Sequence, residues 1–585
     1  CLAAFVWILG ASYRWWRPRG SLLWLDILSM GLIVQAVLDL RLSQIMGVRL
    51  DWPALSLALG ETPKMMWRMA VPYLPMIAAV LLLAIGLYAG VIYWFRRHRR
   101  APEAADGGRL IFPAGAAFAV LTFVGLAVVG RCLMQGDKAE GQSTLLLAET
   151  SPLWKRNEYP VMDSKTFVER ARELGMDRSI AAPATAAAGR TRDLNVILIF
   201  QESTYNRHLS LFSGKEETQP LLSRYKDRME LFPNFFSSFA SSIHARFAAF
   251  TGLYPTEDFK SFTINRVGVK SIFELLHEHS YDCSLFYSSF FDYTGFRDFL
   301  RGRDLDGMYD ADTMPGERKT PPVSWGLQED ETLEAMKTQI KKYAAGNQKF
   351  FLTYIPAAPH NPFDGTPQRF HKYHKDEIGD YTPVYLNELL YMDWVMSSLI
   401  DQLQESGILD HTLVIITADH GEMLGAKGEF VGHGWVVTPE LANVPLIIMD
   451  PDHRGYRVNP TVGSQVDLPS TILDLLGIAT PSGQIRQGSS LYSDAARSDR
   501  TIYLNSFRQY AAIKGRKIIC TDRETPVDSR KVFEIQNNGA QTSFVAVEPP
   551  NAEAPDIVAF NQFQANLLHN YLVYCGLMKP LLAEK

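Results

Sequence analysis

NVILIFQES, residues 195–203, is an unbroken run of β-branched and apolar residues that ends in Gln201, Glu202 and Ser203. A strand buried on both faces has this composition, because neither face meets water. Similar short apolar runs recur at residues 283–287, 350–354, 413–417 and 445–449. These five runs predict the strands of one sheet.

Helical patterns lie between the predicted strands, at residues 271–279, 330–343 and 386–405. Strands that alternate with helices favour an α/β domain around a central, largely parallel sheet. In such sheets ligands bind at the carboxyl ends of the strands. Further along the chain, we expect edge strands and a closing helix at residues 500–504, 508–521 and 561–573.

The first 135 residues have a different character. A helix needs about 20 apolar residues to span the hydrocarbon of a bilayer, and Val71–Phe95 contains no charge. Four buried helices of a soluble domain are the alternative to membrane spans. We predict a multi-span α-helical membrane segment, with apolar stretches at roughly 1–11, 21–38, 69–95 and 110–134.

Charge sets the orientation of this segment. Arginines gather at 14–19 and 96–100, between the first two and the last two stretches. By the positive-inside rule both loops face the cytoplasm, so the chain after about residue 135 lies outside it. We therefore expect membrane helices over 1–134, a juxtamembrane linker over 135–190 with a short helix at 164–174, and an extracytoplasmic domain over 191–585.

Bulk composition excludes some classes of protein. The formal net charge of -5 over 585 residues gives no basic excess for nucleic acid. The five cysteines form no CxxC pair and have no zinc-ligand spacing, so isolated thiols are expected. The chain begins with Cys1 inside an apolar run, which we interpret as a truncated amino terminus, with a lipid-modified cysteine as the alternative.

Acidic and histidine side chains follow two of the predicted strands. LVIITADHGE, residues 413–422, ends in Asp419-His420-Gly421-Glu422. An Asp and a His side by side at a strand end offer an oxygen and an imidazole ligand to a divalent cation. Glu202 follows the first strand and can add a carboxylate, although taken alone it fits a solvated surface residue better.

SIHAR, residues 242–246, supplies a hydroxyl before a helical pattern. A hydroxyl is a poor nucleophile unless a base or a metal lowers its pKa. Next to a cation held by Glu202, Asp419 and His420, Ser242 can ionise and attack phosphorus or sulfur. The alternative is that Ser242 caps the following helix; the two interpretations are compatible.

Several ordered motifs together resemble the sulfatase and alkaline-phosphatase superfamily over about residues 194–480. They are TGLYP at 251–255, PHNPF at 359–363, ADHGE at 418–422, NVPLII at 443–448 and VDLPSTILDLLGI at 466–478. The resemblance implies an alkaline-phosphatase-like α/β fold and a metal-activated nucleophile at Ser242.

Two departures indicate the branch. Sulfatases carry an Asp pair after the first strand and a C/S-x-P-x-R motif whose first residue becomes formylglycine. This chain has Gln201-Glu202, and His244 where the Pro belongs. It is more similar to the lipoteichoic acid synthases and phosphoethanolamine transferases, which have amino-terminal spans and an unmodified hydroxyl nucleophile, usually Thr.

The same resemblance implies residue roles. The metal ligands would be Glu202, Ser242, Asp419 and His420, holding one or two divalent cations (manganese, magnesium or zinc, or calcium in a sulfatase-like enzyme). Arg246, Arg297, His360 and His433 would bind substrate, and the two histidines would also transfer protons. A surface arginine and a packed loop histidine are the alternatives for Arg297 and His360. The family's tryptophan two residues before the arginine is Gly295 here, which leaves the head group open.

These expectations add up to a membrane-anchored, metal-dependent phosphotransferase. It would move a phosphoglycerol or phosphoethanolamine head group from a phospholipid donor to an envelope glycan or glycolipid, through a phospho-serine intermediate. The implied location is a bacterial cytoplasmic membrane. The alternatives are a sulfatase-like hydrolase of sulfate or phosphate esters and a non-catalytic scaffold.

Overall fold

The computed structural model describes residues 160–174, 176, 191–213, 215–256, 267–374, 380–425, 431–479, 485–497, 500–523, 530–548 and 556–576. Apart from Val431, these residues belong to one compact unit. The four predicted membrane spans and most of the predicted linker lie outside the described residues. Among the helices that are described, none is both long and apolar enough to span a bilayer.

An eight-stranded sheet lies at the centre of this unit, in the order β11-β2-β10-β7-β1-β6-β4-β5. The strands from β7 to β5 run parallel, whereas β10 is antiparallel to β7. The prediction of a largely parallel sheet is confirmed, and all five predicted strands belong to it. The strands are β1 (Asn195–Gln201), β2 (Glu230–Leu231), β4 (Asp282–Tyr287), β5 (Gly307–Tyr309), β6 (Phe350–Ile355), β7 (Thr412–Ala418), β10 (Leu446–Met449) and β11 (Arg457–Val458).

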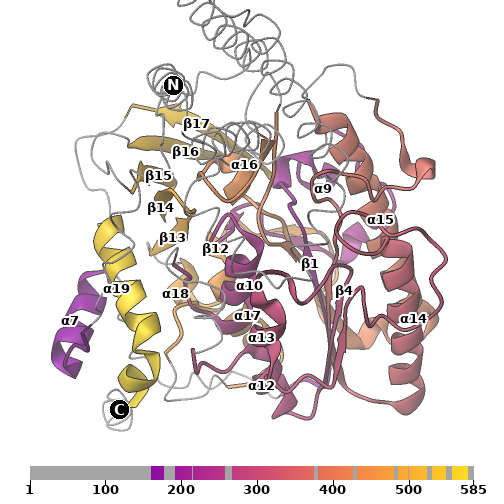
Figure 1. Ribbon diagram of the computed structural model, residues 1–585, viewed down its shortest axis with the longest axis horizontal. Helices are drawn as coiled ribbons and strands as arrows, with labels where there is room; N and C mark the ends of the chain where they lie inside the picture. Colours follow the sequence, from indigo (N-terminus) through magenta and orange to yellow (C-terminus); the bar gives the residue numbers. More distant parts are fainter. Residues whose placement is uncertain are drawn as a thin grey trace, which may run out of the picture. The chain divides into compact units, whose positions relative to one another are not determined.

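Helices cover both faces of the sheet (Figure 1). Side chains alternate along a strand, so Val196 and Leu198 of β1 join one hydrophobic cluster and Ile197 joins the other. The first cluster contains residues of α10 (Ser242–Thr251), α12 (Ile272–His277), α13 (Phe296–Leu300) and α17 (Leu468–Leu475). The second contains residues of α14 (Glu329–Gly346) and α15 (Thr382–Glu405). The helices predicted at 271–279, 330–343 and 386–405 are thus confirmed as α12, α14 and α15.

Helix α10 is buried on every side, from Ile243 to Thr251. A helix without a solvent face must lie between other layers, and α10 packs on both the sheet cluster and α17. It ends at Gly252, whose φ of 73° lets its N–H bond the carbonyl of Ala248. This packing fixes the amino end of α10 relative to the sheet.

A second, antiparallel sheet follows, in the order β13-β14-β15-β16-β17. The segment predicted as one strand at 508–521 is two strands, because a turn at Gly515 (φ 57°) folds it into a hairpin. The last two strands were not predicted; their alternation of buried and exposed residues is weak. The strands are β13 (Thr501–Asn505), β14 (Gln509–Lys514), β15 (Lys517–Asp522), β16 (Lys531–Asn538) and β17 (Gln541–Val547).

Shorter elements connect these layers. The helical ones are α9 (Ser210–Ser213), α16 (Pro439–Ala442), α18 (Asp494–Arg497) and the 3-10 turns η3 (Asn206–His208), η4 (Leu222–Arg228), η5 (Tyr293–Gly295), η6 (Gln368–Phe370), η7 (Leu409–His411) and η9 (Gln465–Asp467). The extended ones are β3 (Phe235–Phe236), β8 (Met423–Leu424), β9 (Val431–Gly432) and β12 (Gly463–Ser464).

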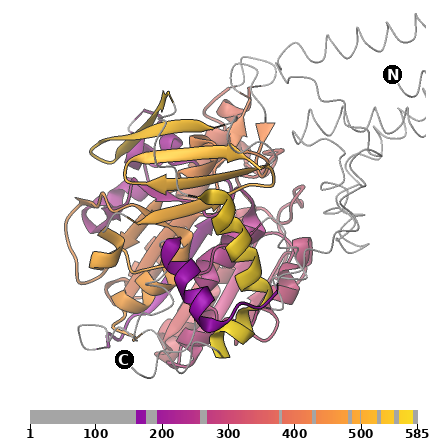
Figure 2. The same cartoon turned by 90° about the vertical axis from the view of Figure 1, so that its left-hand side faces the viewer.

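The helix predicted at 164–174 is present as α7 (Ser164–Glu173). The side chain of Asp163 caps it by accepting the N–H groups of Lys165 and Thr166. Figures 1 and 2 show α7 beside α19 (Ile557–His569), the closing helix predicted at 561–573. The contact is aromatic: the ring of Phe167 stacks on the ring of Phe563 of α19, with centroids 5.1 Å apart, and on that of Tyr574, which follows α19, at 4.0 Å.

Replacing Phe167 by alanine tests this contact. Phe167 is completely buried, so truncation leaves a cavity and should lower the free energy of unfolding by about 3–5 kcal/mol. Val161 lies in the same segment but is 49% exposed, and Val161→Ala should change stability by less than about 0.5 kcal/mol. Thermal and denaturant unfolding of both variants measure the difference. Equal stabilities would contradict a packed α7.

Candidate active site

Two adjacent parallel strands end side by side and carry the first two site residues. In the ladder between β1 and β7, Gln201 is opposite Ala418, so Glu202 and Asp419 are the next residue of each strand. The N–H of Asp419 donates to the carbonyl of Gln201 at 3.0 Å. Both carboxylates are therefore placed at one edge of the sheet, with Glu202 4% and Asp419 0% exposed.

Ser242 lies against these residues. It is the first residue of α10, and the preceding Ser241 occupies the N-cap position. Its Oγ lies 3.1 Å from Nε2 of His420 and 3.3 and 3.4 Å from the two oxygens of Glu202. The hydroxyl therefore contacts the acidic and histidine side chains, and Ser242 is not the N-cap of α10.

The hydrogen bonds of His420 define its tautomer. Its Nδ1 lies 2.8 Å from the carbonyl of Gly421 and donates a proton to it, which leaves a lone pair on Nε2. Burial lowers the pKa of His420 to about 4, so the ring is neutral at neutral pH. A neutral imidazole whose second nitrogen is held by a carbonyl is the form that binds metal ions.

The residues present fit a divalent cation. One ligand atom from each of Glu202, Asp419 and His420 lies within 4.8 Å of the others. Oδ2 of Asp419 is buried and accepts no hydrogen bond from any described residue. Burial, and then the charge of Glu202, raise the pKa of Asp419 to about 6. A bound cation would give the Oδ2 of Asp419 a partner and would offset the repulsion between the two buried carboxylates.

Arg246 lies beneath this cluster rather than at the surface. It is 2% exposed, and its Nη2 donates to Oε2 of Glu202 at 2.9 Å. Its Nη1 donates to the hydroxyl of Tyr287 at 3.1 Å. One turn after Ser242 on α10, Arg246 holds Glu202 from below and offsets part of its charge.

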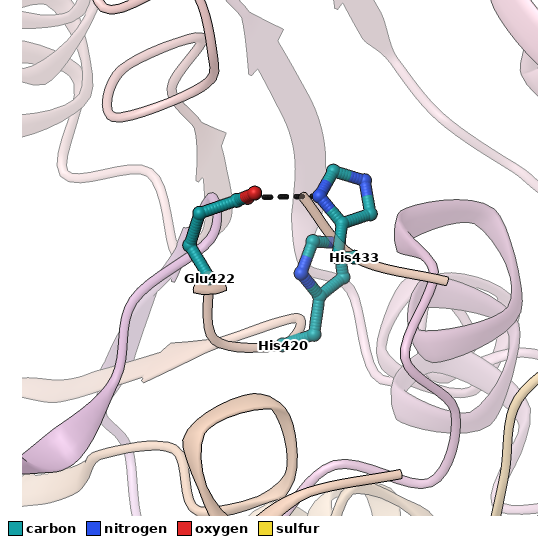
Figure 3. Close-up of side chains that lie close together, drawn as sticks. All are labelled: His420, Glu422 and His433. Carbon is teal, nitrogen blue, oxygen red and sulfur yellow. Dashed lines mark hydrogen bonds and ion pairs between the residues drawn. The ribbon is translucent and has the colours of Figure 1, made fainter. Parts of the chain in front are cut away.

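A second group of side chains adjoins the first and consists of His420, Glu422 and His433 (Figure 3). Nδ1 of His433 lies 2.8 Å from Oε2 of Glu422, and the His433 and His420 rings have centroids 4.0 Å apart. Burial alone would lower the pKa of His433, but Glu422 raises it to about 9. His433 can therefore carry a proton at neutral pH, or take a second cation together with Glu422.

His360 is the neighbour of His433 on the other side, with ring centroids 5.4 Å apart. Its Nδ1 donates to the carbonyl of Asn361 at 2.6 Å, which leaves Nε2 as an acceptor. Burial, and then the charge of His433, lower the pKa of His360 to about 4. The pKa of His360 is thus lowered and that of His433 raised, and such a separation of pKa values is typical of acid and base partners.

Arg297, expected to bind phosphate, is engaged with two carboxylates. Its Nε donates to Asp292 at 2.5 Å and its Nη2 to Asp310 at 2.9 Å. About a third of its side chain (36%) is exposed. Among the described residues, no hydrogen bond or ion pair joins Arg297 directly to Ser242. Because the guanidinium is already paired, a bound phosphate would compete with Asp292 for it.

Trp325 is a site neighbour that sequence reasoning missed. Its ring lies 4.4 Å from that of His360 and 5.3 Å from that of Tyr293. Its Nε1 donates to the carbonyl of Asn361 at 2.6 Å, the carbonyl that also accepts from His360. Trp325 precedes α14 in a segment without a motif, so nothing in its local sequence marks it. Glu422, by contrast, stood in the ADHGE motif but was assigned no role.

Comparison with known proteins identifies what this chain resembles. Residues 194–478 match the family model described as Sulfatase. The lipoteichoic acid synthase-like YvgJ of Bacillus subtilis (strain 168) is 26% identical over 358 residues, which cover 58% of this chain and 55% of that protein. The chain thus spans little more than half the length of this relative.

Two solved structures show the same fold. One is a protein in the alkaline phosphatase superfamily from Vibrio parahaemolyticus, with a TM-score of 0.55 over 72% of this chain and 98% of that chain. The other is the lipoteichoic acid synthase LtaP from Listeria monocytogenes, with a TM-score of 0.52 over 71% of this chain and 98% of that chain. Both are 17% identical in sequence to this chain, so they establish the alkaline-phosphatase-like fold alone.

Cation binding is the first property to test. Manganese or zinc should raise the melting temperature with the logarithm of its concentration, by an amount equivalent to about 2.7 kcal/mol at a hundred times the dissociation constant. Glu202→Gln removes a charged ligand and should weaken binding at least about tenfold. Glu334→Gln, on the exposed face of α14, is the control and should bind normally. Unchanged affinity in Glu202→Gln would exclude this carboxylate as a ligand.

Gly421 tests how closely the backbone after His420 must pack. A Cβ at this position would lie 1.8 Å from the carbonyl oxygen of Glu440, so Gly421→Ala must displace backbone. We expect cation affinity to fall about tenfold or more, measured by calorimetric titration. Gly346→Ala, where no atom lies within 4 Å of the added Cβ, should bind the cation as the unaltered protein does.

Proposed function

We propose that this chain, whose residues 194–478 match the Sulfatase family model, is a membrane-anchored, metal-dependent phosphotransferase. Its donor is a phospholipid with a phosphoglycerol or phosphoethanolamine head group, and its acceptor is an envelope glycan or glycolipid. The contact of the Ser242 hydroxyl with both Glu202 and His420 is the observation that carries this proposal.

The ligand set supports attack by an unmodified serine. A divalent cation bound by Glu202, Asp419 and His420 would act as a Lewis acid that lowers the pKa of the Ser242 hydroxyl. Ser242 also stands at the amino end of α10, where the helix dipole favours an anionic substrate. Arg246 keeps Glu202 in place from below while the hydroxyl reacts.

In the first step, the hydroxyl of Ser242 loses its proton to solvent and its Oγ attacks the donor phosphorus, and the bond from phosphorus to the lipid glycerol oxygen breaks. His433, protonated through its pair with Glu422, donates a proton to that leaving oxygen. In the second step, the acceptor hydroxyl attacks the phosphorus of the phospho-serine, and the bond from phosphorus to Oγ of Ser242 breaks. His360, with Nδ1 held by Asn361 and Nε2 free to accept, takes the proton of that hydroxyl.

The rest of the chain supports a lipid donor. Val71–Phe95 is an uncharged apolar stretch long enough to span a bilayer, and it would hold the catalytic domain at the membrane surface. Among relatives, the B. subtilis protein is described as lipoteichoic acid synthase-like, which agrees with a phosphoglycerol donor. Gln201-Glu202 and His244, where sulfatases have an Asp pair and a Pro, argue against a formylglycine at position 242.

A trapping experiment tests the nucleophile. Incubation with phosphatidylglycerol or phosphatidylethanolamine labelled in the head-group phosphate should place the label on the peptide containing Ser242, and Ser242→Ala should abolish turnover. Ser241→Ala is the matched control, because this neighbouring hydroxyl makes no capping hydrogen bond. Turnover by Ser242→Ala would refute the assignment. A formylglycine at 242 with cleavage of sulfate esters would establish the sulfatase alternative instead.

A further inference from the structure

Glu329 is a buried carboxylate to which the proposed reaction assigns no role. It is the first residue of α14 and only 1% exposed. Its Oε1 accepts the N–H groups of Ala357 and Ala358, at 2.8 and 3.0 Å. Its Oε2 accepts the hydroxyls of Ser288, at 2.5 Å, and of Tyr354. None of these four donors belongs to α14.

The donors lie on two segments that carry candidate substrate residues. Ala357 and Ala358 begin the loop that reaches His360, whose N–H bonds the carbonyl of Ala357 at 3.2 Å. Ser288 follows β4 and begins the segment that leads to Arg297. Glu329 therefore accepts hydrogen bonds from the first residues of both segments at the same time.

Further contacts join the two segments above Glu329. The N–H of Ser288 donates to the carbonyl of Ile355 at 3.0 Å, and the carbonyl of Ser288 accepts from Leu327 at 2.9 Å. Trp325, two residues earlier, lies against the rings of His360 and Tyr293. A displacement of Ser288 or of Ala357 and Ala358 would thus also displace the ring of His360.

A carboxylate in this place is costly for the fold. Removing a charged group from water costs several kcal/mol unless hydrogen bonds satisfy it, and burial raises the pKa of Glu329. Four donors and the amino end of α14 offset this cost. Two oxygens that each accept two donors can bridge segments that a single apolar side chain cannot tie together.

We propose that Glu329 is a positioning residue for the transfer reaction, which fixes the loop of His360 relative to the segment of Arg297. The proposal rests on the function proposed above, because it assigns His360 a part in proton transfer. Glu329 does not touch the reacting atoms; it acts through His360.

Glu331 provides a matched control two residues further along α14. It is 8% exposed, and its Oε1 accepts the N–H groups of Lys319 and Thr320, both at 2.7 Å. It thus has the same helix turn, the same chemistry and similar burial, but it holds an exposed segment without a candidate substrate residue.

The test compares Glu329→Asp, Glu329→Gln and Glu331→Asp in the full chain. Aspartate is one methylene shorter and cannot reach both segments, so Glu329→Asp should lower kcat about 10- to 100-fold with little change in KM. Glutamine keeps the reach, and its amide can accept both N–H groups and donate to the two hydroxyls. Glu329→Gln should therefore stay within about threefold of the unaltered enzyme, as should Glu331→Asp.

A double-mutant cycle separates positioning from general damage. If Glu329 acts through His360, Glu329→Asp should lower kcat by less than about threefold when His360 is already alanine. Full additivity of the two losses would overturn the proposal, and so would an equal loss in Glu331→Asp. A loss in Glu329→Gln as large as in Glu329→Asp would also overturn it.

A chemical probe tests Glu329 without relying on activity. The rate of His360 modification by diethyl pyrocarbonate, followed by mass spectrometry of its peptide, reports how firmly the ring is held. We expect faster modification in Glu329→Asp and an unchanged rate in Glu331→Asp. If the unaltered protein turns over no phospholipid, the proposed function fails, and this rate alone decides the role of Glu329. Equal rates in all variants would overturn it.

Discussion

Two carboxylates are forced together where β1 and β7 end side by side. Glu202 and Asp419 are the next residues of paired parallel strands, and both are buried. Their mutual repulsion in a medium of low dielectric constant is unfavourable unless a cation lies near them. Arg246 supplies one positive charge from below, and the orphaned oxygen of Asp419 leaves room for another. The arrangement of the site follows from the need to offset the negative charges of Glu202 and Asp419.

The surrounding layers keep the pair in place. Helix α10 is buried on all sides, so its amino end cannot move away from the sheet edge, and it presents both Ser242 and Arg246 to Glu202. The same helix thus provides the candidate nucleophile and the counter-charge of its ligand. The Cβ-free backbone of Gly421 lets the chain after His420 pass directly against α16, which keeps His420 within reach of Ser242.

Proton transfer depends on a second arrangement of charges. His360 and His433 lie close together, but burial and the charge of His433 lower the pKa of His360, whereas the pair with Glu422 raises the pKa of His433. The His360 loop follows β6, the segment of Arg297 follows the neighbouring strand β4, and both segments share Glu329 as a common support. Geometry at the two histidines therefore depends on a residue that no motif marks.

The sequence by itself determined the α/β class and the main strands, and it named Glu202, Ser242, Asp419 and His420 as candidate site residues. Short apolar runs rich in β-branched residues favour the middle of a sheet, and polar residues that directly follow them lie at its edge. Only the tertiary structure decided three features of the fold: the antiparallel direction of β10, the strands β16 and β17, and the packing of α10 on α17. The tertiary structure also decided that Arg246 is buried under Glu202, and that Trp325 and Glu329 both contact the loop of His360. Such contacts join residues dozens to hundreds of positions apart, and they depend on packing geometry, which local residue patterns do not encode.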